Sequence, residues 1–146
     1  MVKYNFIGPY GNDSSVGHLS TPITNSMLTR TILGILPIYR SGLSSISRGL
    51  EIGIVHGYFL VGPFYKLGPL RNSEIALLTG YLSSIGLIII LGLALALYGT
   101  VTYSKTNYIM GDVLESKIGW QRFTGGFFIG ALGGSGLAFL ILNLID

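Results

Sequence analysis

Two ionisable side chains, Glu51 and His56, lie in an otherwise apolar, glycine-spaced stretch of the chain between Arg48 and Pro63. An ionisable group in an apolar membrane segment is costly, and such groups usually have a partner, line a cavity or bind a ligand. The carboxylate and the imidazole each offer one oxygen or nitrogen atom to a metal ion or a proton. Glu51 and His56 are therefore the candidate functional residues of this chain.

The spacing of the two residues predicts separate sites. In a helix, five residues leave Glu51 and His56 roughly 140° apart around the axis and about 7.5 Å apart along it. The two side chains then face different neighbours. This geometry argues against a shared metal cluster or a tight acid/base pair, and it favours two sites with one ligand atom each.

The composition is that of an integral membrane protein. Of the 146 residues, 49% are hydrophobic and only 10% are charged, whereas soluble domains carry about a quarter charged residues. We expect one membrane domain over residues 1–146, because no hydrophilic block is long enough for a second. The net charge of +3 is small and dispersed, which does not suggest nucleic acid binding. The absence of cysteine excludes disulfides and thiolate sites.

The predicted fold is all-α, with three transmembrane helices over residues of about 47–67, 75–103 and 122–145. The second and third contain uncharged runs of 30 and 23 residues, long enough to cross a hydrocarbon core of about 30 Å. The first is shorter in apolar length, so it must include Glu51 at one end and continue through Pro63 at the other, with a kink expected at the proline.

The arm before the first span, residues 1–46, is rich in glycine and proline and is expected to be irregular. From Ser26 to Pro37, apolar residues recur at helical spacing after a cap at Asn25 or Ser26. This pattern predicts a short amphipathic helix at the membrane surface. Contact with lipid and packing against other protein are equally open.

Glycine recurs at every fourth residue in both the first and the third predicted span. The first stripe comprises Gly49, Gly53 and Gly57, and the second comprises Gly126, Gly130 and Gly134. Such a stripe forms a groove without side chains that admits a neighbouring helix or a flat ligand. Helix packing is the commoner outcome.

Positive charge predicts the orientation. Residues 1–50 and 105–122 together carry seven Lys and Arg residues, whereas the connector 66–74 carries two. By the positive-inside tendency, the N-terminus faces the cytoplasm or the plastid stroma, and the C-terminus faces the lumen. Among the remaining polar residues, His18, Asp112 and Glu115 are expected to be solvated in loops rather than to bind a cation.

Four segments carry a family resemblance. They are VGHLSTPI at 16–23, LPIYR at 36–40, RGLEIGIVHGYFLVGPFYKLGPLRNSE at 48–74 and GWQRFTGGFFIGALGGSG at 119–136. In this order and with these connector lengths, they closely resemble photosystem I reaction centre subunit XI, the L subunit.

The resemblance implies a non-catalytic, three-helix subunit at the edge of photosystem I in the thylakoid membrane. It implies that Glu51 and His56 are axial ligands to the magnesium of chlorophyll a, with carotenoid (β-carotene or similar) and structural lipid on the apolar surface. The implied partners are the photosystem I core and small subunits and light-harvesting antenna, with trimerisation of the complex in cyanobacteria. The lack of a presequence and the many Ile and Tyr residues favour an algal plastid over a cyanobacterium.

Two other classes compete with this interpretation. Intramembrane ionisable groups also mark ion pathways, so the alternative is a small transporter or channel subunit that uses Glu51 and His56 as a proton path. The other is a purely structural membrane anchor. The offset of the two side chains around the helix weighs against a proton path.

Overall fold

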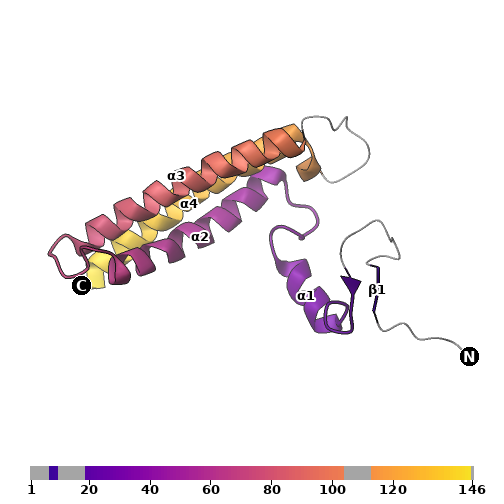
Figure 1. The fold of residues 1–146 in the computed structure, drawn as a ribbon, viewed down its shortest axis with the longest axis horizontal. Coiled ribbons are helices and arrows are strands. Elements are labelled where there is room, and N and C mark those ends of the chain that lie inside the picture. The colour runs from indigo at the N-terminus through magenta and orange to yellow at the C-terminus, as the bar shows by residue number, and fades with distance from the viewer. Residues whose placement is uncertain (1–6, 10–18, 104–112, 146) are drawn as a thin grey trace, which may run out of the picture. The chain divides into compact units, whose positions relative to one another are not determined.

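The computed structural model describes residues 7–9, 19–103 and 113–145, and the chain divides into two compact units, Met1–Gly42 and Leu43–Asp146 (Figure 1). In the first unit, strand β1 (Gly8–Pro9) pairs antiparallel with β2 (Leu19–Ser20). The described fold is otherwise helical, as expected, and this two-residue ladder is a regular pairing that was not expected in the irregular arm. The ladder is short, and a proline without an N–H is compatible with such a strand at a sheet edge.

Helix α1 spans Met27–Ile35 and follows the predicted pattern. Ser26 caps it, because its side-chain oxygen accepts a hydrogen bond from the backbone N–H of Thr29 at 3.2 Å. Leu36 is extended, as expected for the residue before a proline. The helix buries none of its own residues, so its apolar face is exposed. Its location at a membrane surface stays a prediction.

The second unit begins with helix α2, Ser45–Leu67, close to the expected bounds of 47–67. The Ser44 hydroxyl accepts from the backbone N–H of Ser47 at 3.2 Å and caps it. The helix continues through Pro63 and ends at Gly68. Arg48 is buried near its start and donates from Nε to the Leu43 carbonyl at 3.3 Å.

Helix α3 spans Ala76–Thr102, and helix α4 spans Lys117–Ile145 after the short 3-10 helix η2 (Val113–Glu115). Helix α4 begins at Lys117, earlier than the expected start near residue 122. The Ser116 hydroxyl accepts from the N–H of Gly119 at 2.9 Å and stabilises this additional turn. In the described part of the chain, α3 and α4 are the helices long and apolar enough to cross a membrane by length and composition. Helix α2, with Glu51 and Arg48 among its residues, falls short of that standard.

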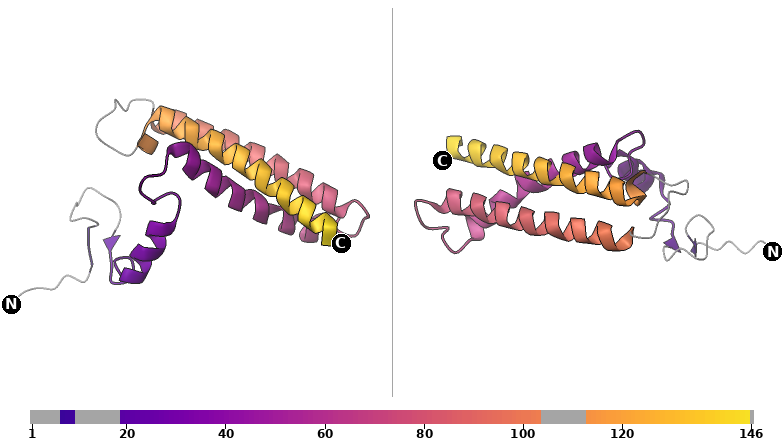
Figure 2. Two further views of the ribbon diagram at one scale, coloured as in Figure 1. Left: turned by 180° about the vertical axis from the view of Figure 1, so that it is seen from behind. Right: turned by 90° about the horizontal axis from the view of Figure 1, so that it is seen from above.

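Helices α2 and α4 run parallel and pack backbone to backbone (Figures 1 and 2). A Cβ atom on Gly49, Gly53 or Gly57 would overlap the carbonyl oxygens of Phe123, Phe127 and Ala131, in that order. In return, a Cβ atom on Gly126, Gly130 or Gly134 would overlap the carbonyl oxygens of Ile46, Leu50 and Ile54. The two predicted glycine grooves therefore fill each other. Helix packing, and not a flat ligand, occupies them.

Helix α3 runs antiparallel to this pair. Its Gly80 lies against the backbone of Tyr65 on α2, and it meets α4 through side chains. The indole of Trp120 on α4 lies over Gly99 of α3 and donates from Nε1 to the carbonyl of Leu95 at 2.7 Å. At the other end, Tyr81 of α3 stacks on Phe139 of α4 with ring centroids 4.7 Å apart. Between them, Ile88, Phe127 and Ala131 form the buried core cluster.

Candidate functional site

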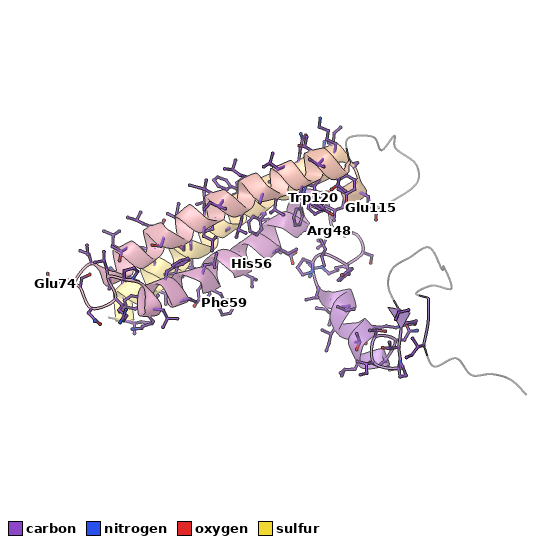
Figure 3. The ribbon with its side chains drawn as sticks, in the orientation of Figure 1. Arg48, His56, Phe59, Glu74, Glu115 and Trp120 are labelled. Carbon is purple, nitrogen blue, oxygen red and sulfur yellow. The ribbon has the colours of Figure 1, made fainter. Side chains whose placement is uncertain are left out.

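His56 lies midway along α2, in a row with Ile52 and Leu60, one turn away on either side (Figure 3). Ile52 and Leu60 are partly buried and pack against the core cluster. His56 between them is exposed. The row therefore presents one polar ring at a surface that is otherwise apolar.

One hydrogen bond defines the tautomer of this imidazole, that is, which of its two nitrogens bears the hydrogen. Nδ1 of His56 lies 2.8 Å from the carbonyl oxygen of Ile52, one turn earlier in the same helix. A carbonyl oxygen can only accept, so Nδ1 carries the proton and donates. In the neutral ring, Nε2 then keeps its lone pair. Nε2 has no hydrogen-bond partner among the residues that the structure describes. This is the arrangement in which histidine binds a metal ion.

Glu51 lies on a different face of α2. It is two residues from both Gly49 and Gly53, a rotation of about 200°, so it points away from the face that packs on α4. Its side chain is partly buried. The structure therefore places Glu51 and His56 on different faces of α2, as their spacing predicts.

The other polar residues do not form a site. In residues 7–9, 19–103 and 113–145, no group of three or more His, Asp or Glu side chains could hold a metal ion. Glu115 is exposed in η2. His18 and Asp112 lie outside the described residues.

The family model for photosystem I reaction centre subunit XI matches residues 6–146. The chain belongs to this family. Photosystem I reaction centre subunit XI of Isochrysis galbana is 58% identical over 97% of this chain and 96% of its own length. The proteins of that name from Gracilaria tenuistipitata var. liui and Trichodesmium erythraeum are 55% and 53% identical over 94% of this chain and 91% and 86% of their lengths.

Membership identifies the chain as a subunit of photosystem I in the thylakoid membrane, where it is associated with the photosystem I core. Relatives occur in algae and in cyanobacteria. The proton-path alternative is not favoured, because the family is one of photosystem subunits and the two ionisable residues face apart.

Two contributors to the site were missed from the sequence. The carbonyl of Ile52 could have been found, because a helical histidine reaches the carbonyl one turn earlier by spacing alone. Phe127, whose ring lies against His56, could not. It lies on another helix, and nothing in the local sequence pairs the two.

Proposed function

We propose that this photosystem I subunit binds chlorophyll a through His56 and Glu51, each as the axial ligand of a different pigment. The observation that carries the proposal is the imidazole of His56, which is exposed on an apolar helix and whose Nδ1 is hydrogen-bonded to the carbonyl of Ile52, leaving Nε2 facing outward. The bound pigments supply light absorption and transfer of excitation energy. The chain supplies their ligands and their positions, and it catalyses no reaction.

The donor atoms fit the magnesium of a chlorophyll. A magnesium ion in a macrocycle already has four nitrogen ligands and takes one more hard or borderline donor. His56 offers the lone pair of Nε2, and the Nδ1–H bond to the Ile52 carbonyl holds the ring on the helix. Glu51 offers a carboxylate oxygen on the face of α2 away from α4. One ligand atom at each place is what a macrocycle with one vacant axial position requires.

Apolar surface for the rest of the pigment is present on the same helix. Val55 and Phe59 are 53% and 69% exposed, and Figure 3 shows Phe59 projecting from the outer edge of α2. Large exposed apolar side chains favour contact with lipid, carotenoid or the phytyl chain and ring of a chlorophyll. We assign carotenoid and structural lipid to this surface.

All three long helices span the membrane in this proposal. Helix α2 has 23 residues, about 34 Å of helix, which covers a hydrocarbon core of about 30 Å. Its backbone packing along α4 supports the same depth in the bilayer. The end of α4 lies at the same end of the bundle as the loop between α2 and α3 (Figures 1 and 2). With the positive-inside tendency, that end is lumenal and the arm is stromal.

For the assembly, we propose contact with the large photosystem I core subunits, with small subunits and light-harvesting antenna nearby. The compartment is an algal plastid. Because α2 and α4 satisfy each other's glycine stripes internally, these stripes require no symmetry partner. This supports a monomeric complex, as opposed to the trimer that the family resemblance implies for cyanobacteria.

Ligand removal tests the proposal. Photosystem I with His56→Leu is expected to lack one chlorophyll while the subunit still assembles, since the side chain is exposed and leucine keeps an apolar contact with Phe127. His56→Gln is the matched control and should retain pigment through its amide oxygen. Glu51→Leu should remove a different chlorophyll, and Glu51→Gln should keep it. Pigment occupancy in high-resolution density maps is the measurement.

Two results would contradict the assignment. Unchanged occupancy in His56→Leu, without a water molecule in place of the ligand, removes His56 as a ligand. Weaker assembly in both Glu51→Leu and Glu51→Gln, with all pigments present, instead favours an ion pair of Glu51 with Arg48, three residues earlier.

A further inference from the structure

The ring of Phe127, on α4, lies edge-on against the imidazole of His56, on α2. The ring centroids are 5.9 Å apart and the planes meet at 63°, within the range of a favourable aromatic pair. Phe127 is 4% exposed and forms the core cluster with Ile88 and Ala131. The phenylalanine ring is therefore held by the core, while His56 faces outward.

The backbone of Phe127 is at the same time a contact point of the glycine stripes. A Cβ atom on Gly53 would overlap the Phe127 carbonyl oxygen, and one on Gly49 would meet the Phe127 backbone nitrogen at 2.8 Å. Phe127 therefore cannot move along α2 without disturbing this packing. The backbone that carries the Phe127 ring is therefore held in place by the close packing of α2 on α4.

One hydrogen bond does not define the plane of an imidazole. The χ2 torsion of histidine is broad, so the bond from Nδ1 to Ile52 leaves the ring free to tilt about that contact. A second contact is needed to restrict the tilt. The edge-on Phe127 ring is the aromatic contact that the structure provides to His56 in the described residues.

We infer that Phe127 is a positioning residue for the ligand at His56. By restricting the imidazole plane, it aims the Nε2 lone pair and so orients the magnesium macrocycle that binds there. The inference rests on the proposed function and adds that α4, which contributes no ligand, sets the geometry of a pigment on α2. The register of the two glycine stripes is thereby coupled to the orientation of that pigment.

Adjacent phenylalanines provide a matched test. Phe127 contacts His56, whereas Phe128 packs near Gly92 on α3. Photosystem I would be purified from strains with His56→Leu, Phe127→Leu, Phe127→Met or Phe128→Leu, and its absorption and linear dichroism compared with the unaltered complex. His56→Leu identifies the band of the pigment in question. Phe127→Leu and Phe127→Met are expected to keep the area of this band but to shift its position and dichroism, and Phe128→Leu to leave it unchanged.

Each other outcome has a definite meaning. An unshifted band in the Phe127 variants, or an equal shift in Phe128→Leu, overturns the positioning role while the loss in His56→Leu still supports the ligand. If His56→Leu loses no band, both proposals fail. If Phe127→Leu is not incorporated, Phe127→Met carries the test, since the flexible methionine side chain adapts better to the space left by the ring. An unchanged imidazole plane in the density of that complex overturns the inference.

Discussion

Helix α4 holds its two neighbours in different ways. Against α2 it places glycine on backbone, in both directions, over three turns of each helix. Against α3 it places aromatic side chains, with Trp120 over Gly99 and Phe139 stacked on Tyr81. A backbone contact has no rotamer with which to adjust, whereas a side chain does. The helix with both candidate ligands is the one that meets α4 backbone to backbone, so the positions of the ligands depend on a contact with little freedom to adjust.

The largest effect is expected when a side chain is forced between α2 and α4. Gly53→Ala places a methyl group onto the carbonyl oxygen of Phe127, and overpacking against backbone should cost about 3 kcal/mol or more. SDS titration in mixed micelles, followed by the fluorescence of the single tryptophan, measures the change. Gly62→Ala is the control on the same helix, because nothing lies within 4 Å of its Cβ position. Equal stability of the two variants would show that the contact between α2 and α4 is not as rigid as its backbone packing indicates.

A smaller effect is expected from the hydrogen bond that joins α3 to α4. Trp120→Phe keeps an aromatic ring over Gly99 but removes the donor to the Leu95 carbonyl. The loss should be about 1 to 2 kcal/mol. Because this variant lacks the tryptophan, protease resistance in the same SDS titration replaces fluorescence. A loss as large as that of Gly53→Ala would show that α3 is held as firmly as α2.

The smallest effect is expected when the same glycine-to-alanine change is made on the α3 side. The Cβ of Gly92→Ala would meet Cδ2 of the Phe128 ring at 3.2 Å, and that ring can turn by the few tenths of an ångström required. The gain in helix propensity, about 1 kcal/mol, offsets this strain. We expect a net change within about 1 kcal/mol, measured as for Gly53→Ala. Destabilisation as severe as that of Gly53→Ala would mean that Phe128 is as immobile as backbone.

Much of the helical structure was predictable because its causes are local. The start of α1 follows from a serine cap and its end from the residue before Pro37, and both are properties of neighbouring residues. Helix α4 begins at Lys117, about five residues before the predicted start, which lies later because Lys117 and Trp120 resemble connector residues by charge and polarity. The hydroxyl of Ser116 and the docking of Trp120 on α3 favour helix there. The pairing of β1 with β2 was missed because two residues give no strand periodicity.

The sequence alone determined the class of the protein, its family resemblance, its long helices and the two ionisable residues in an apolar stretch, because composition and periodicity report local physics. It also showed that each glycine stripe needs a close neighbour. Only the tertiary structure decided that the two stripes pack on each other and that Phe127 lies against His56. Periodicity tells which residues share a face of a helix. It does not tell which face another helix meets, since that depends on the relative shift and rotation of segments distant in the chain.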